Sequence, residues 1–348
     1  MKPSVPGRLH AQGLTSARFN AAADVVRHLG CVQSQLHDMA LWAVARRTTG
    51  LTLADTQAAF DRGDFLRTHV LRPTWHFVDP RDLPWLTTLT APRIRRLMNS
   101  SWAAMGLGQD LIDRGLEVIQ AALADGAPHT RAELNTALGE AGLPSDGRFL
   151  VHQLMNAEIS MLCANGPMRG KQHTYVALQP VAVDLTYDEL LAQVALRYAQ
   201  GHGAFRDKDL AWWTSLTLTD SRRAIELAGL RPIDVGGETH WTLDDPVDAD
   251  VPRVMLLSNF DEYISYARDP DDYTGFDGTV DDVMRGAGLL MLDGRLSGRW
   301  SRTVTARKVT IVVDQAPRIT TATRRALEAE AAAFGSFLCR EPELVVTD

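Results

Sequence analysis

The sequence has little of what defines several common functional classes. Its 348 residues include only three cysteines, Cys31, Cys163 and Cys339, which are far apart and odd in number. They match no zinc or redox spacing, so we expect buried or half-buried thiols in a reducing cytoplasm. No apolar run reaches the roughly 18 residues that a membrane span needs. Residues 1–10 have no apolar core of a secretory signal. We therefore expect a cytoplasmic protein that does not enter a membrane.

Motifs for nucleotide and serine chemistry are also missing. The chain has no glycine-rich phosphate loop and no Gly-x-Ser-x-Gly motif, so we expect neither a nucleotide-dependent enzyme nor a serine hydrolase. The net charge is −7 and the pI about 5.8. This excludes a protein that is basic all over, but not DNA binding, because phosphate contacts need only a local basic face.

Such local basic stretches are present in three intervals that contain no acidic residue. The intervals run between Asp82 and Asp110, between Glu158 and Asp184, and between Asp293 and Asp314. They are either three solvated strips or parts of one surface that follows DNA phosphates. Their basic residues are Arg93, Arg95 and Arg96, then Arg169, Lys171 and His173, then Arg295, Arg299, Arg302, Arg307 and Lys308.

The chain repeats one coarse pattern, in which two or three helices precede a short β-hairpin. In residues 1–82 we expect helices at 17–29 and 40–47, a third capped by Thr52 with Asp55, and strands within 67–78. In residues 83–182 a connecting helix at 83–105 precedes helices at 111–124 and 147–162, with one between them capped by Thr130 and Glu133. A hairpin at 161–178 follows. This order and a basic hairpin tip are typical of a winged-helix unit.

The helix at 147–162 is the candidate recognition helix of the second unit. It offers the polar side chains of Arg148, His152, Gln153 and Asn156 to a groove. Residues 183–250 form a third unit, with helices at 187–200, 208–214 and 219–227 and a wing at 231–243.

Residues 251–348 break the pattern. We expect a small antiparallel sheet or barrel at 252–317, with strands at 254–266, 287–293 and 308–314, and a closing helix at 321–338. The predicted fold class is therefore α+β: three tandem winged-helix units, a small antiparallel β-barrel or sheet, and a C-terminal helix.

Taken in order, short stretches of this sequence resemble the bacterial winged-helix DNA-binding family that includes AlkZ- and YcaQ-type DNA glycosylases. The resemblance extends from about residue 8 to residue 340. The matching stretches are Gly-Cys-Val-Gln-Ser-Gln at 30–35, Ala-Leu-Trp at 40–42, Leu-Arg-Pro-Thr-Trp-His-Phe-Val at 71–78, Gly-Pro-Met-Arg-Gly-Lys-Gln at 166–172, Gly-His-Gly at 201–203, Ala-Trp-Trp at 211–213, Asn-Phe-Asp-Glu-Tyr at 259–263 and Asp-Gly-Arg at 293–295.

The resemblance implies that Gln33 and Gln35 are the catalytic residues, because the family uses a Gln-x-Gln or Gln-x-Asp motif. The Gln-x-Gln form resembles the AlkZ branch, which is associated with self-resistance to DNA-crosslinking natural products. The middle position is usually aliphatic there and is Ser34 here. Residues two apart share a face only in extended chain, so Gly30 should end a helix before the motif. The alternative is that both glutamines simply cap a helix end.

Other candidates are open to two interpretations. His76 either contacts DNA near the active site or is packed or hydrogen-bonded within the protein, and Arg72 is a further DNA-binding candidate. Of the neighbouring Asp261 and Glu262 we expect at most one, preferably Asp261, to support the active site, and an ion pair with an arginine is the alternative. Trp212 and Trp213 suit the core better than a base-stacking surface. The remaining DNA-binding candidates are Arg93, Arg96, Arg169, Lys171, His173, Arg295, Arg299 and Arg302.

The resemblance implies a monofunctional glycosylase that excises N7-alkylguanine and unhooks interstrand crosslinks. Its partner is duplex DNA with alkylated or crosslinked purines, and we expect a monomer without a metal, nucleotide or redox cofactor. The alternatives are a winged-helix regulator and a protein that sequesters lesions without cutting them. A regulator usually has its own dimerisation element, and this sequence has no heptad run.

Overall fold

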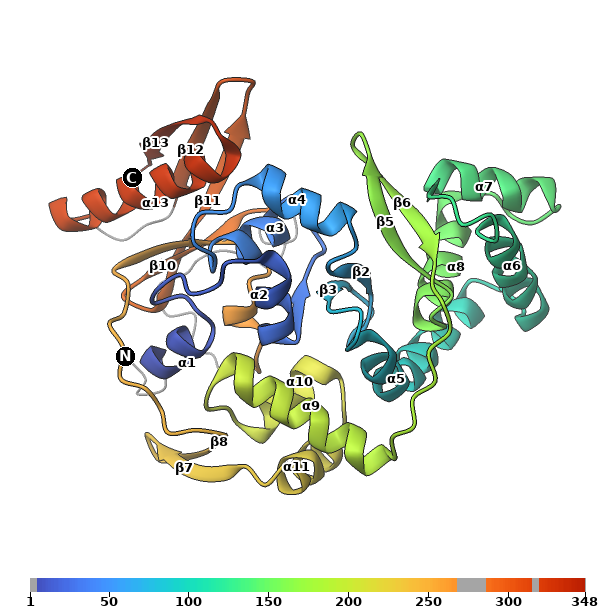
Figure 1. The fold of residues 1–348 in the computed structure, drawn as a ribbon, viewed down its shortest axis with the longest axis horizontal. Coiled ribbons are helices and arrows are strands. Elements are labelled where there is room, and N and C mark those ends of the chain that lie inside the picture. The colour runs from blue at the N-terminus through green and yellow to red at the C-terminus, as the bar shows by residue number, and fades with distance from the viewer. Residues whose placement is uncertain (1–4, 268–285, 315–318, 348) are drawn as a thin grey trace.

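A computed structural model describes residues 5–267, 286–314 and 319–347 as a mixed α+β fold. In Figure 1, α6, α7 and α8 lie with the β5–β6 hairpin on one side, and α13 with β12 and β13 on the other. The helices α9, α10 and α11 lie along a third side, and α2, α3 and β3 occupy the middle.

The helices are α1 (Val5–Ala11), α2 (Ala22–Leu29), α3 (His37–Ala45), α4 (Leu53–Asp61), α5 (Leu83–Ala104), α6 (Gln109–Ala122), α7 (Arg131–Glu140), α8 (Gly147–Ile159), α9 (Tyr187–His202), α10 (Asp207–Thr214), α11 (Leu218–Leu227), the 3₁₀-helix η1 (Glu262–Ile264) and α13 (Thr321–Leu338). The strands are β1 (Cys31–Gln33), β2 (Leu66–His69), β3 (Trp75–Val78), β4 (His129–Thr130), β5 (Cys163–Arg169), β6 (Gln172–Ala177), β7 (Arg231–Val235), β8 (Glu238–Thr242), β9 (Val254–Leu257), β10 (Gly288–Leu292), β11 (Arg295–Val304), β12 (Lys308–Asp314) and β13 (Glu341–Val346).

The helix starts follow the caps that the sequence predicts. The Thr52 side chain accepts from the backbone N–H of Asp55, and Thr130 accepts in the same way from Glu133. In both cases the acidic side chain bonds back to the backbone of the cap residue, which completes a capping box. These predictions are confirmed.

One sheet joins the first two predicted units. Its described strands have the order β1-β3-β2-β5-β6-β4, and β2 meets β5 where Arg67 lies opposite Asn165. At one end, Gln33 lies opposite His76, and His76 lies opposite Thr68. Directly paired residues point to the same face of a sheet. A row of three polar side chains therefore begins at the first glutamine of the motif.

The second sheet confirms one of the two predicted alternatives for the C-terminal region and corrects its details. Of a sheet or a barrel, the described strands form a sheet, in the order β13-β12-β11-β10-β9. The helix α13 is not the last element, because β13 follows it and pairs in parallel with β12. The strand expected at 254–266 ends at Leu257 and gives way to η1. Residues 268–285 and 315–317, which the predicted sheet included, lie outside the described residues.

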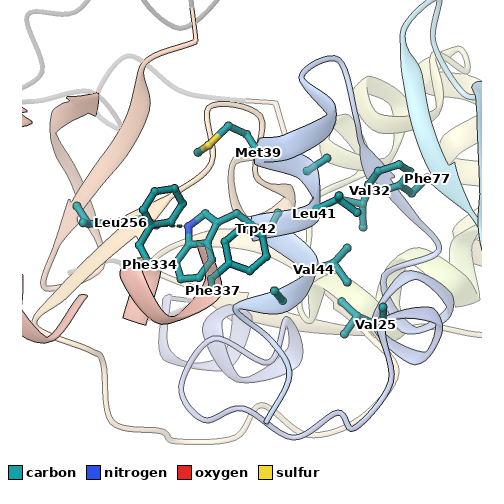
Figure 2. Packing of buried hydrophobic residues seen from close by; sticks show 14 of the residues in the cluster. Val25, Val32, Met39, Leu41, Trp42, Val44, Phe77, Leu256, Phe334 and Phe337 are labelled. Atoms are coloured by element: carbon teal, nitrogen blue, oxygen red, sulfur yellow. Dashed lines mark hydrogen bonds between the residues drawn. The ribbon is translucent and has the colours of Figure 1, made fainter. Parts of the chain in front are cut away.

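The first predicted unit shares its hydrophobic core with the C-terminal region. Trp42 of α3 packs against Phe334 and Phe337 of α13, with ring centroids 5.1 and 5.3 Å away. Its indole N–H also donates to the carbonyl of Leu256 in β9 at 2.8 Å (Figure 2). These regions are about 200 to 300 residues apart in sequence, yet they exclude water from one common interior.

Within the described residues, no helix is long and apolar enough to cross a bilayer.

Candidate active site

The Gln-x-Gln motif lies where a helix gives way to a short strand. The helix α2 ends at Leu29, and Gly30 adopts φ 80°. A Cβ at position 30 would lie 2.8 Å from Cγ of Arg197, so the turn needs glycine. Gln33 is the last residue of β1, and α3 begins after a bend that contains Gln35. The predicted helix exit into extended chain is confirmed.

The backbone between the two glutamines is fixed from both sides. The Ser34 N–H donates to the carbonyl of Trp75 at 2.7 Å. The Ser34 carbonyl accepts from Nε of Arg67 at 3.0 Å, and the Arg67 guanidinium lies 4.4 Å from the centre of the Trp75 ring. Because Arg67 is buried, this hydrogen bond is shielded from water and holds the motif firmly.

Gln33 is held through its side chain by Arg72. Nη2 of Arg72 donates to Oε1 of Gln33 at 3.0 Å and lies 3.3 Å from Nε2 of His76. Nδ1 of His76 lies 2.9 Å from the carbonyl of Thr74, which can only accept. His76 is therefore protonated on Nδ1 and accepts from Arg72 through Nε2. Burial, together with the positive charge of Arg72, lowers the pKa of His76 to about 3.

Gln33 is held through its backbone by Glu262. The Gln33 N–H donates to Oε1 of Glu262 at 2.9 Å, while Trp213 Nε1 and His202 Nε2 lie 3.1 and 3.3 Å from Oε2. Burial alone raises the pKa of this carboxyl, but the hydrogen bond from His202 and the positive charge of Arg72 outweigh it, and the pKa falls to about 2. Glu262 is thus a buried anion with both oxygens occupied.

The Gln35 side chain differs from that of Gln33 in its hydrogen bonding. Its Oε1 is buried and has no hydrogen-bond partner among the described residues. The hydroxyls of Ser34, Thr68 and Thr74 are in the same situation. A buried acceptor that lacks a protein partner is costly, so such an atom is suited to bind a water or a substrate group. The site therefore offers neutral polar groups.

A buried polar network connects the site to the second predicted unit. Glu158 of α8 accepts from His69 of β2, from Trp75 Nε1 at 3.4 Å and from Asn165 Nδ2 of β5 at 3.3 Å. The Asn165 side chain in turn accepts from Arg67. Sequence reasoning missed Arg67 and Glu158, because their partners are far away along the chain.

Asp261 adopts the alternative arrangement considered above, an ion pair with an arginine. Its carboxylate accepts from Arg47 at 2.7 and 3.1 Å, and both side chains are fully buried. Of the two neighbouring carboxylates, Glu262 meets the motif, and the preference for Asp261 is corrected on this point. The sequence could not distinguish them, because the 3₁₀-turn at Glu262–Ile264 replaces the expected strand.

The two tryptophans that follow Ala211 differ in their surroundings. Trp213 is fully buried and donates to Glu262, whereas Trp212 is 37% exposed and lies under the Arg72 guanidinium, 4.3 Å from its ring centre. The core assignment is therefore correct for Trp213 and wrong for Trp212.

The other predicted DNA-binding residues lie on separate elements. Arg93 and Arg96 are exposed on α5, and Lys171 is exposed at the β5–β6 turn. Arg169 pairs with Glu133 at 2.6 Å. His173 faces His37 at a ring distance of 5.1 Å, and burial lowers its pKa to about 3.

On β11, Arg295 is exposed, whereas Arg299 pairs with Asp314 at 2.8 Å. Burial lowers the pKa of Arg302, although Asp38 opposes this. On the candidate recognition helix, Gln153 and Asn156 are buried, so they do not reach a groove, and Arg148 is exposed there.

In the described part of the chain, no cluster of three or more His, Cys, Asp or Glu side chains is placed to hold a metal ion.

Comparison with known proteins adds two findings. Residues 26–337 match the family model described as DNA glycosylase AlkZ-like. The fold is similar to the solved structure of the Streptomyces sahachiroi DNA glycosylase AlkZ, with a TM-score of 0.77, 22% sequence identity and coverage of 100% of both chains. No curated protein matches the sequence.

Proposed function

The chain belongs to the AlkZ-like DNA glycosylase family, and on that premise we propose that it excises N7-alkylated purines, above all N7-alkylguanine, and unhooks interstrand crosslinks. The observation that supports this substrate class is that the motif offers no acid. Gln33 and Gln35 provide neutral amide groups, and the buried carboxylate of Glu262 is held by three donors. A motif without an acid suits a base that is already cationic and needs no proton to leave.

The proposed reaction is hydrolysis of the bond between C1′ and N9. N7-alkylation gives the purine a positive charge, and the electron pair of the breaking bond passes to N9 and neutralises it. As in glycoside hydrolysis, the sugar then resembles an oxocarbenium ion. Water adds to C1′ and releases its proton to solvent. We assign to Gln33 and Gln35 the positioning of that water, and such positioning alone contributes several kcal/mol.

We infer that the helix and hairpin groups at 1–82, 83–182 and 183–250 act as winged-helix units, with 251–348 as a fourth part, and that the protein binds duplex DNA as a monomer in the cytoplasm. Exposed basic residues on α5, the β5–β6 tip and β11 support contacts with phosphates. These residues are Arg93, Arg96, Lys171 and Arg295. The proposed role is DNA repair or self-resistance to a DNA-alkylating natural product.

The test is base release from a duplex with a single N7-methylguanine. We expect the wild type to release free base and leave an intact abasic strand, and the Gln33→Ala/Gln35→Ala variant to bind the duplex but release none. Gln120→Ala, an exposed glutamine change on α6, is the matched control and should keep full activity. Release by the double variant would refute the site. If the wild type fails on methylguanine but unhooks a natural-product crosslink, the enzyme requires bulky lesions; failure on both would refute the proposal.

A further inference from the structure

A strained turn precedes the strand that carries His76. Leu71 has φ 65°, a left-handed conformation that residues with a Cβ rarely adopt because the Cβ approaches the following carbonyl. The turn is held by the fully buried Leu71 side chain and by a hydrogen bond from its N–H to Thr90 Oγ1 at 3.2 Å. The backbone N–H of the next residue, Arg72, donates to the carbonyl of Val70 at 2.8 Å. Such strain persists at sites where it orients a functional group, and here that group is the Arg72 side chain.

Arg72 is fixed at three points. Nη2 reaches Gln33 Oε1 at 3.0 Å and His76 Nε2 at 3.3 Å, and the guanidinium lies over the ring of Trp212 at 4.3 Å. The N–H of His76 is directed to the carbonyl of Thr74, so its Nε2 can only accept. Both hydrogens of the Arg72 Nη2 therefore have acceptors, and a stacked aromatic ring supports the guanidinium plane.

This arrangement determines how Gln33 is oriented. A guanidinium has donors only, so the Gln33 atom that faces it must be the carbonyl oxygen. The amide nitrogen of Gln33 is then the group that remains for the substrate side. Gln35 is the opposite case, because its carbonyl oxygen is the atom without a partner among the described residues.

We propose that Arg72 is a positioning residue, which makes Gln33 the hydrogen-bond donor of the motif and leaves Gln35 as its acceptor. This inference rests on the proposed function. A water that accepts from Gln33 and donates to Gln35 has one orientation, with a lone pair left to attack C1′. The two glutamines then have unlike roles, and Arg72 acts only through the first of them.

The first test does not depend on activity. Gln33→Glu places a carboxyl beside the guanidinium, and ¹³C NMR measures its pKa. We expect the pKa to lie clearly below the usual value of about 4.3 and to rise by about one unit or more when Arg72→Met is added. Arg72→Lys keeps the charge and should give an intermediate value, and thermal melting confirms that each variant is folded. An equal pKa in all three backgrounds would overturn the inference.

The second test is a double-mutant cycle on single-turnover base release from the N7-methylguanine duplex. Arg72→Met should slow release about ten- to a hundredfold. If Gln33→Ala alone leaves a measurable rate of release, adding Arg72→Met to it should slow release no further. Combined with Gln35→Ala, Arg72→Met should slow release by the same factor as it does in the wild type. Affinity for undamaged duplex should change less than about twofold.

Multiplicative effects with both glutamines, or a loss of affinity at an unchanged rate, would make Arg72 a separate DNA contact and overturn the inference. If the wild type releases no base, the proposed function fails, while the pKa measurement still decides the role of Arg72.

Discussion

At the scale of single residues, the site depends on a carboxylate that does not face the substrate. Glu262 is fully buried, and an isolated buried charge is strongly unfavourable. Here three donors compensate it: the Gln33 N–H, the Trp213 indole and His202. Glu262 thus links the motif to α9 and α10 and fixes the backbone of Gln33.

Glu262→Gln tests this link. The carboxamide has one oxygen, which can still accept a hydrogen bond. Its NH₂ group replaces the other oxygen and cannot accept from the donors that face it, so at least one buried hydrogen bond is lost. We expect the free energy of unfolding to fall by about 2–4 kcal/mol and base release to slow. Urea unfolding measures the first effect. Glu117→Gln, at an exposed position on α6, is the control and should stay within about 0.5 kcal/mol of wild type. Unchanged stability would mean that Glu262 is not an anchor.

The sequence predicts the local conformation of the motif but not the distant residues that contact it. Gly30 ends α2 for a local steric reason, so the extended chain at Gln33 follows from neighbouring residues. Glu262 reaches Gln33 across 229 positions. Whether it or Asp261 faces the motif depends on the Arg47 ion pair, which no local pattern encodes.

At the scale of elements, the β5–β6 hairpin has a fixed base and an exposed tip. Its base joins β2, and close to the tip the Met168 N–H donates to Asp61 of α4 at 2.9 Å. At the tip, Gly170 takes φ 65° and Lys171 points to solvent. Arg169 is occupied by Glu133 and by the carbonyl of Pro128. The two basic residues should therefore differ in how they meet DNA.

Lys171→Ala should weaken binding to any duplex and reduce the slope of log affinity against log salt by about one. Arg169→Ala should change the slope less, because its charge is already paired with Glu133. Fluorescence anisotropy over a salt series measures both. Arg324→Ala, on the exposed side of α13, is the control with no expected effect. Equal slopes for Lys171→Ala and wild type would remove the hairpin tip from the DNA interface.

The elements themselves were predictable where the chain has local signals. The capped helices α4 and α7 begin where Thr52 and Thr130 predict. β13 was missed because its residues are mostly exposed and follow a helix without a turn signal, and only pairing with β12 makes them a strand. The groove face assigned to α8 was wrong at Gln153, which packs against Gly115. Which face of a helix is buried depends on neighbours that the sequence does not name.

At the scale of the whole molecule, the C-terminal helix stabilises the first unit. Phe334 is 1% exposed and packs against Trp42 and Trp300. We expect Phe334→Ala to reduce the free energy of unfolding by about 3–5 kcal/mol through the cavity that it leaves. In urea, the midpoint should fall while the slope stays constant. An unchanged midpoint would show that the shared core is not tightly packed.

Histidines held neutral by burial should make the whole protein sensitive to acid. Burial lowers the pKa of His76 to about 3, of His173 to about 3 and of His28 to about 4. In the unfolded chain a histidine titrates near 6.5. Between these values the unfolded state binds more protons, so the free energy of unfolding should fall as pH decreases from about 6.5. Glu262 does not interfere there, because its contribution is lost only below its unfolded value of about 4.3.

His76→Gln isolates one of these contributions in the window from pH 5 to pH 6. Each buried neutral histidine adds a slope of about 1.4 kcal/mol per pH unit, so the variant should lose about that much slope. Glutamine can still accept from Arg72, so the variant should remain folded at pH 7. Urea unfolding at several pH values gives the slope. A slope equal to that of wild type would mean that His76 can be protonated in the folded protein, and the hydrogen-bond direction from Arg72 to His76 would then be wrong.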